Sequence, residues 1–371
     1  MFKVLTLLGT RPEIIKLSCT IAKLEQHFNH VLVHSGQNYD YELNEVFFKE
    51  LGLPKPKHFL EAACNKPAET IARVIERLDK VLEMESPDAM LLLGDTNSCL
   101  GVIAAKRRKI PIFHMEAGNR CFDQRVPEEI NRKVIDHLSD INLVYTEHAR
   151  RNLLAEGFAA DSIYKTGSPM REVLNTYSAN IENSDILTRC NLEPQQYFVA
   201  SAHREENVDS PERLQQLIDS LSRVSEKYEK RILFSVHPRT QARLEKYGIN
   251  RIKEIQYTKP LGFFDYIKLQ KNAFCVISDS GTLTEEASIL GFPAITIREA
   301  FERPEGMDEG SIVMAGLNAE RILQAISIVT IKDNLKVIAP PDYSSDNVSN
   351  KVLRIIISYT DFINKNTWRK I

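Results

Sequence analysis

Residues 114–132 decide the fold of this chain and read HMEAGNRCFDQRVPEEINR. The apolar run 110–113 precedes them and is typical of a buried strand, and Pro127 suits the first position of a helix. So many ionisable and hydrogen-bonding groups could not be buried in a core without partners. The stretch therefore predicts a strand, a polar turn and a helix that together form the floor of a binding crevice.

Within this stretch, Glu116 lies at the predicted carboxyl end of the strand. Glu128, Asn131 and Arg132 share one helix face, because their spacing is i, i+3 and i+4. We expect Glu116, Glu128, Arg132 and His114 to converge on one crevice. Two structural alternatives stay open: Glu128 and Arg132 could form an ordinary surface ion pair, and His114 could be a buried imidazole with satisfied nitrogens.

Composition narrows the class of protein. The 371 residues are 43% hydrophobic and 26% charged, which is enough chain for two domains of ordinary size. A net charge of −2 gives no overall attraction to nucleic acid or to an acidic membrane, so neither is an expected partner. The six cysteines show no CxxC spacing, which argues against a zinc site or a disulfide framework and fits a reducing cytoplasm.

The N-terminal run MFKVLTLL is expected to be a first strand and not a signal peptide. No segment reaches the roughly 18 uninterrupted apolar residues of a membrane span. A cytoplasmic location follows as an expectation.

Short apolar runs alternate with amphipathic segments, which predicts an α/β fold with parallel, doubly wound sheets. The predicted strands are residues 4–8, 31–34, 89–93, 110–113, 141–145, 163–166, 198–201, 231–236, 252–256, 274–278 and 294–297. The predicted helices include residues 12–27, 68–83, 98–108, 127–138, 211–227, 241–246, 262–270 and 283–290. We predict two Rossmann-like domains, 1–170 and 171–346, with the tail 347–371 packing back on the first and a binding crevice between them.

In such sheets, ligands bind beyond the carboxyl ends of the strands. The first predicted strand is followed by GTRPE at 9–13, a turn and helix start whose N–H groups could face an anion, with Arg11 as a phosphate partner. Asp95 follows the third strand, where it could instead simply cap the next helix.

In the second half, His203 and His237 each follow a predicted strand, and a histidine there can titrate near neutral pH. The segment SDSGT at 278–282 offers N–H groups and hydroxyls suited to a diphosphate. Glu285 or Glu286 could accept both ribose hydroxyls. Neither a GxGxxG nor a Walker GxxxxGKS motif occurs, so the sequence predicts neither an NAD site nor an ATP site of those types.

Taken together, several motifs resemble those of the non-hydrolysing UDP-N-acetylglucosamine 2-epimerases. They are GTRPE at 9–13, GDT at 94–96, HMEAG at 114–118, PEEINR at 127–132, HR at 203–204, DSG at 279–281 and EEA at 285–287. The resemblance spans both halves of the chain in the same order. It implies a GT-B fold, two Rossmann domains facing a crevice, a UDP-sugar substrate, and usually a homodimer. The residues themselves show no metal-ligand pattern, so neither a metal nor a cofactor is expected.

Some stretches look closest to one subgroup, the UDP-N-acetyl-L-fucosamine synthases. These are SGQNYDYEL at 35–43, GSPM at 167–170, HREENV at 203–208 and KVLRIIISYTD at 351–361. The subgroup implies 2-epimerisation of UDP-2-acetamido-2,6-dideoxy-L-talose for a capsule or O-antigen sugar. The first stretch replaces a pattern associated with an allosteric sugar nucleotide, which argues against activation by UDP-N-acetylglucosamine. The alternatives are a UDP-N-acetylglucosamine 2-epimerase, a GT-B glycosyltransferase and a non-catalytic UDP-sugar sensor.

The resemblance also implies a mechanism: UDP is eliminated across C1–C2 to a 2-acetamidoglycal and is then added back with the proton on the other face. By motif, the acid–base carboxylates are Asp95, Glu116 and Glu128, and His203 stabilises the departing diphosphate. The expected UDP- and substrate-binding residues are Arg11, Lys16, Arg132, His237, Ser280, Gly281 and Glu286.

Overall fold

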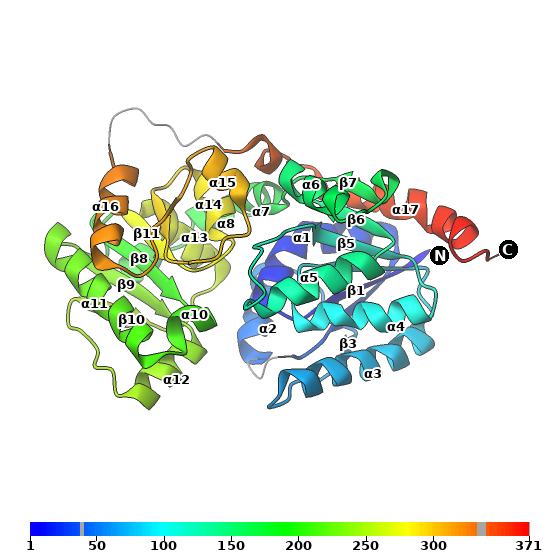
Figure 1. The fold of residues 1–371 in the computed structure, drawn as a ribbon, viewed down its shortest axis with the longest axis horizontal. Coiled ribbons are helices and arrows are strands. Elements are labelled where there is room, and N and C mark those ends of the chain that lie inside the picture. The colour runs from blue at the N-terminus through cyan, green and yellow to red at the C-terminus, as the bar shows by residue number, and fades with distance from the viewer. Residues whose placement is uncertain (38–40, 332–338, 371) are drawn as a thin grey trace. The chain divides into compact units, whose positions relative to one another are not determined.

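The structure, a computed structural model, describes residues 1–37, 41–331 and 339–370 and divides the chain into two compact units (Figure 1). Unit 1 contains Met1–Thr176 and Pro341–Ile371, and unit 2 contains Tyr177–Pro340. Each unit has its own parallel sheet and its own apolar core. The prediction of two Rossmann-like α/β domains is confirmed.

Among the described residues, seven parallel strands form the unit 1 sheet in the order β3-β2-β1-β4-β5-β6-β7. The strand order reverses between β1 and β4, so the loops that follow these strands flank a topological switch point, where doubly wound sheets bind ligands. The strands are β1 (Lys3–Leu8), β2 (Asn29–His34), β3 (His58–Phe59), β4 (Ala89–Leu93), β5 (Ile112–Ala117), β6 (Ile141–Val144) and β7 (Ile163–Lys165).

Helices pack against the apolar side chains of this sheet. The helix α1 begins with a capping box of Thr10 and Glu13, and the last helix, α17, packs against α1 although it comes from the end of the chain (Figure 1). The helices of unit 1 are α1 (Arg11–His27), α2 (Tyr41–Glu50), α3 (Pro67–Glu85), α4 (Val102–Arg107), α5 (Pro127–Leu138), α6 (Glu147–Ala155), α7 (Met170–Thr176) and α17 (Val348–Asn366), with short 3₁₀ turns at Asn97–Gly101, Ala160–Ser162 and Pro341–Tyr343.

In the described part of unit 2, six parallel strands follow the order β10-β9-β8-β11-β12-β13. The order reverses between β8 and β11, which gives this sheet its own switch point. The strands are β8 (Tyr197–Ala202), β9 (Arg231–Val236), β10 (Ile255–Thr258), β11 (Cys275–Ser278), β12 (Ala294–Thr296) and β13 (Val313–Met314). The helices are α8 (Ser178–Glu182), α9 (Ile186–Arg189), α10 (Glu205–Val208), α11 (Pro211–Tyr228), α12 (Pro238–Tyr247), α13 (Phe263–Asn272), α14 (Leu283–Leu290), α15 (Pro304–Asp308) and α16 (Ala319–Val329).

The structure corrects some predicted bounds. The edge strands β3 and β13 have two residues each and were not predicted, because so short a segment has no readable alternation. The strand predicted at 110–113 is Ile112–Ala117, since His114, Met115 and Ala117 still pair with β6. The helix predicted at 98–108 begins as a 3₁₀ turn. No helix among the described residues has the length and apolar character needed to cross a membrane.

Candidate functional site

Several of the predicted site residues follow the strands next to the two switch points. In unit 1, Leu93 at the end of β4 pairs with Met115 in β5. Asp95 and Glu116, which come two residues and one residue later, therefore lie at neighbouring positions along the carboxyl edge of the sheet. The register of the sheet brings two carboxylates of the predicted catalytic set to one place.

The backbone of Glu116 has an unusual conformation for a residue in a strand. It lies in β5 where the register shifts between Met115 and Ala117, with φ of +64°, a left-handed conformation that is uncommon outside glycine. Its carboxylate pairs with Lys16 at 2.6 Å, and the two side chains are only 12% and 3% exposed. The bulge turns a charged side chain out of the strand, and the buried cation offsets the cost of its burial.

Asp95 contacts the predicted polar face of α5. The guanidinium Nε of Arg132 donates to Oδ2 of Asp95 at 2.7 Å, and Nδ2 of Asn131 donates to the Asp95 carbonyl at 2.9 Å. Thr96, and not Asp95, takes the N-cap position of the following 3₁₀ turn. Glu128 lies half-buried in the first turn of α5. The expected face is confirmed for Asn131 and Arg132.

A carboxylate that the sequence reasoning passed over holds the loop before α5. Glu129 accepts hydrogen bonds from the backbone N–H groups of Cys121 (3.0 Å) and Phe122 (3.1 Å) and pairs with Arg132 at 2.7 Å. Burial alone would raise its pKa, but these partners hold the pKa below its usual value. The spacing i, i+3 between Glu129 and Arg132 is the sequence signal that could have predicted this ion pair.

His114 does not join this group of residues, so the expectation that it converges on the crevice is wrong. It is 1% exposed, with Nδ1 lying 2.9 Å from Asp136 and Nε2 lying 2.8 Å from the carbonyl oxygen of Gly94. The alternative of a satisfied buried imidazole holds. Asp136 also pairs with the buried Arg120 at 2.8 Å and accepts from the N–H of Gly118.

The loop after β1 is organised by Glu13. This buried carboxylate accepts from the N–H groups of Gly9 and Thr10 (2.7 Å each) and from the hydroxyl of Thr96 (2.8 Å), so it joins the loops after β1 and β4. Burial raises its pKa. Two of the N–H groups that were expected to face an anion are thus occupied by a side chain. Arg11 is half-buried, with its guanidinium 5.9 Å from the ring centroid of Phe47.

In unit 2, His203 directly follows β8 and its side chain is 37% exposed. Its Nδ1 lies 3.1 Å from Oδ1 of the fully buried Asp279, at the end of β11. Asp279 also accepts from the backbone N–H groups of His203 and Arg204 and from the amide of Asn207. Asp279 belongs to the motif at 279–281, but its position after a strand does not by itself predict this role.

The other predicted residues of unit 2 lie on neighbouring loops. His237 follows β9 and caps α12, its Nδ1 accepting from the N–H of Arg239, and its ring centroid is 5.6 Å from that of His203. The Ser280 hydroxyl contacts that of Thr282 at 3.1 Å.

Gly281 and Glu286 lie close to a buried ionic cluster. A Cβ on Gly281 would come within 2.7 Å of Nη1 of Arg303 and 2.8 Å of Oε1 of Glu302, so this position has no room for a side chain. Arg303 pairs with Glu285 at 3.0 Å, and Glu285 is fully buried. Glu286 keeps 6% of its surface exposed and accepts from Gln270 at 2.8 Å. The cluster was missed because its members come from separate elements.

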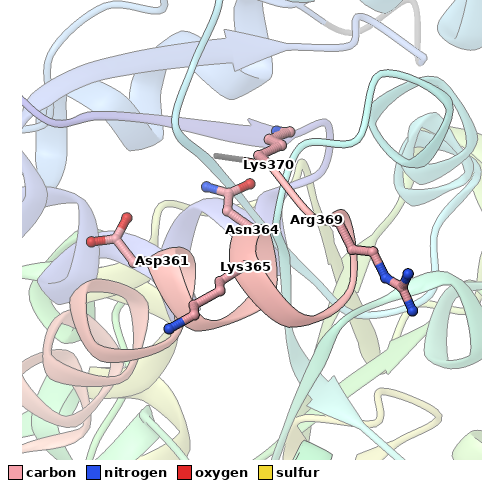
Figure 2. A pocket seen from close by; sticks show the side chains of 5 residues that line it. All are labelled: Asp361, Asn364, Lys365, Arg369 and Lys370. Carbon is pink, nitrogen blue, oxygen red and sulfur yellow. The ribbon is translucent and has the colours of Figure 1, made fainter.

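A hollow of about 760 Å³ lies around the last turns of α17, and none of the residues described above lines it. Its lining side chains are Asp361, Asn364, Lys365, Arg369 and Lys370. Figure 2 shows that they do not converge, since Lys365 and Arg369 point to opposite sides. Within the part of the chain that the structure describes, no three histidine, cysteine or acidic residues gather as metal ligands.

Comparisons with known proteins agree on one family. The model of the UDP-N-acetylglucosamine 2-epimerase family matches residues 22–357. A structure of UDP-N-acetylglucosamine 2-epimerase from Rickettsia bellii is 53% identical, covers 100% of both chains and has a TM-score of 0.92. The UDP-N-acetylglucosamine 2-epimerase of Methanocaldococcus jannaschii is 37% identical over 89% of this chain and 93% of its own.

A crystal structure of the Methanocaldococcus jannaschii UDP-GlcNAc 2-epimerase in complex with UDP-GlcNAc and UDP is 35% identical, covers 96% of this chain and 100% of its own, and has a TM-score of 0.91. The UDP-2,3-diacetamido-2,3-dideoxy-D-glucuronate 2-epimerase of Pseudomonas aeruginosa is 34% identical over 87% of this chain and 91% of its own. The chain therefore belongs to the UDP-N-acetylglucosamine 2-epimerase family of isomerases.

Proposed function

We propose that this protein inverts C2 of a UDP-2-acetamido sugar by eliminating UDP and adding it back. The C2 proton is weakly acidic because no carbonyl lies next to it. In the proposed step a base removes this proton, the C1–O bond breaks, and UDP leaves with the electron pair to give a 2-acetamidoglycal. Re-addition of UDP and delivery of a proton to the other face of C2 complete the inversion.

One observation carries the proposal: two carboxylates at adjacent strand ends of unit 1 each pair with their own cation. Glu116 pairs with Lys16, and Asp95 pairs with Arg132. Proton transfer at two faces of one carbon calls for more than one acid–base group, and the paired cations keep several acids tolerable in a small volume. We assign the transfer to Asp95, Glu116 and Glu128.

The UDP would be held by residues of unit 2. His203 and His237 follow adjacent strands, and the loop at Ser280 and Gly281 offers a hydroxyl and a backbone without a side chain. A diphosphate leaving group carries negative charge that such donors stabilise as the C–O bond breaks. Glu286, in the same loop-and-helix segment, is assigned to the ribose.

The test is an incubation of the protein with its UDP-sugar in heavy water, using substrate that carries ¹⁸O in the bridge between C1 and the diphosphate. Elimination predicts deuterium at C2 in both epimers and movement of ¹⁸O from the bridge into the other β-phosphate oxygens. Inversion of C2 without uptake of deuterium would contradict the proposed deprotonation. A glycosyltransferase would give neither result without an acceptor.

For the substrate, we propose UDP-2-acetamido-2,6-dideoxy-L-talose, on the motifs that resemble the fucosamine subgroup. Part of the first motif, residues 38–40, lies outside the described residues. UDP-N-acetylglucosamine is the second candidate, and it is favoured by the names of the Rickettsia and Methanocaldococcus relatives. Turnover of the two nucleotides side by side separates them: a kcat/KM at least tenfold higher for the L-talose derivative supports the first.

A further inference from the structure

The structural feature behind this inference is a buried carboxylate under the loop that carries His203. The side chain of Asp279 is fully buried, and its contacts lie between the end of β11 and the start of α10. Its Oδ1 lies 3.1 Å from Nδ1 of His203. The histidine itself remains 37% exposed, so one side of the ring faces protein and the rest can reach a ligand.

Asp279 fixes the backbone beneath the ring as well as the ring. Its carboxylate accepts from the N–H of His203 at 3.0 Å, from the N–H of Arg204 at 3.0 Å and from Nδ2 of Asn207 at 3.1 Å. A carboxylate with so many donors is held ionised. Its protonation would remove hydrogen-bond acceptors and leave buried N–H groups without a partner. Burial alone would raise the pKa of Asp279, but His203 and these donors hold it well below its usual value.

The geometry sets the tautomer of the imidazole. An ionised carboxylate only accepts hydrogen bonds, so a ring nitrogen at 3.1 Å from it must carry the proton. With Nδ1 protonated, Nε2 lies on the opposite side of the ring and either accepts a proton or, once protonated, donates to an anion.

We propose that Asp279 is a positioning residue that holds His203 in one orientation with Nδ1 protonated, so that Nε2 is the nitrogen presented to the ligand. This inference rests on the proposed function for the role of His203. Asp279 itself would not touch the substrate. It acts through the histidine, as an orienting carboxylate does for a catalytic imidazole in other enzymes.

The first test uses nitrogen-15 NMR of protein labelled at its histidines, with the His203 signals identified by their loss in His203→Gln. The wild-type protein is expected to show Nδ1 protonated. In Asp279→Asn the amide N–H₂ faces the ring, so the neutral form is expected to shift its proton to Nε2. An unchanged Nδ1–H signature in Asp279→Asn would overturn the proposal, and this readout does not depend on turnover.

The second test is a double-mutant cycle on kcat for C2 inversion. Asp279→Asn is expected to lower kcat about ten- to hundredfold with His203 present, the range seen for supporting carboxylates. In the His203→Gln background the same change should cost less than about twofold, because the residue it acts through is gone. Equal losses in both backgrounds would show a merely structural role and overturn the proposal.

Asp219→Asn is the matched control, because Asp219 is exposed on α11 in the same unit and its oxygen accepts from Gln215. It should change neither readout. Thermal unfolding of each variant, followed by circular dichroism, verifies that the fold is retained. If the wild-type protein does not invert C2 at all, the proposed function fails, while the NMR result still decides the role of Asp279.

Discussion

Each unit of this protein contains a histidine paired with a buried aspartate, and the two pairs differ in one respect. In unit 1, Nδ1 of His114 lies 2.9 Å from Asp136, and in unit 2, Nδ1 of His203 lies 3.1 Å from Asp279. His114 is 1% exposed and its second nitrogen meets a backbone carbonyl, whereas the side chain of His203 is 37% exposed. The pairing alone therefore does not separate the two histidines. In the proposed function, the exposed side chain of His203 is what lets it reach a ligand.

The largest effect is expected in the sealed pair. Asp136→Ala should lower the free energy of unfolding of unit 1 by about 3 kcal/mol, because Arg120 and His114 lose a buried partner. The single tryptophan, Trp368, lies in unit 1, so its fluorescence during urea unfolding reports on that unit. The exposed Asp161→Ala serves as control. A loss below about 1 kcal/mol would contradict the prediction, because that is the contribution of an ordinary surface ion pair.

His203, the histidine of the open pair, should matter for turnover and not for folding. His203→Gln is expected to lower kcat about a hundredfold, or about 2.7 kcal/mol in the barrier, since acid–base and charge-stabilising groups contribute at least that much. Its midpoint of thermal unfolding should stay within about 2 °C of the wild-type value, because substitutions of exposed residues change stability little. The exposed His27→Gln is the control. Near-normal turnover of His203→Gln would place this histidine with His114 as a structural residue.

A smaller effect is expected at the glycine that adjoins the buried ionic cluster. Gly281→Ala would place a Cβ 2.7 Å from Nη1 of Arg303 and 2.8 Å from Oε1 of Glu302, so either these buried side-chain ends or the loop must shift. We expect UDP to bind about tenfold more weakly, which corresponds to about 1.4 kcal/mol. Calorimetric titration with UDP measures this. Gly291→Ala tests backbone conformation alone, because a Cβ there meets nothing within 4 Å but φ is +73°. Equal affinities of wild type and Gly281→Ala would contradict the prediction.

The smallest effect concerns pH. The pKa of Asp279 is lowered in the folded protein, so the stability it contributes is present above the unfolded pKa of about 3.9 and is lost as pH falls through the folded pKa. Between about pH 4.5 and 3.5, unit 2 of the wild type should lose about 0.7 kcal/mol more than the same unit of Asp279→Asn. Hydrogen exchange of peptides from β8 and β11 measures this difference. Identical pH slopes would mean that the carboxylate is not held ionised.

Much of the fold was predictable because its signals are local. The fully apolar run of β4 and the start of α5 at Pro127 needed no knowledge of distant residues. The face of α5 followed from helical spacing, and the structure brings Asn131 and Arg132 of that face to Asp95. The strands β3 and β13 were not predicted. Each has two residues and is defined only by its pairing with a neighbouring strand, β2 for β3 and β12 for β13.

The site was predictable only in part. Loop residues such as Asp95 and His203 could be named because polar groups after a parallel strand lie at the ligand-binding edge. Glu129 and Glu13 were not recognised, since their roles depend on N–H groups in loops that pack against them. His114 was expected at the crevice. It lies inside a strand, so the packing around the sheet determines what its side chain contacts, and the sequence does not show this packing.

The sequence by itself determined the alternation of strands and helices, the strand-end motifs and the family, because these depend on residue order and local periodicity. Only the tertiary structure decided which charged groups meet. His203 and Asp279 are separated by 76 positions, yet they are in contact because parallel strands align their carboxyl ends. Lys16 and Glu116 are separated by 100 positions and meet because α1 packs beside the end of β5. Burial then decided which histidine is closed off and which can reach a ligand, since exposure belongs to the packed chain and not to the residue.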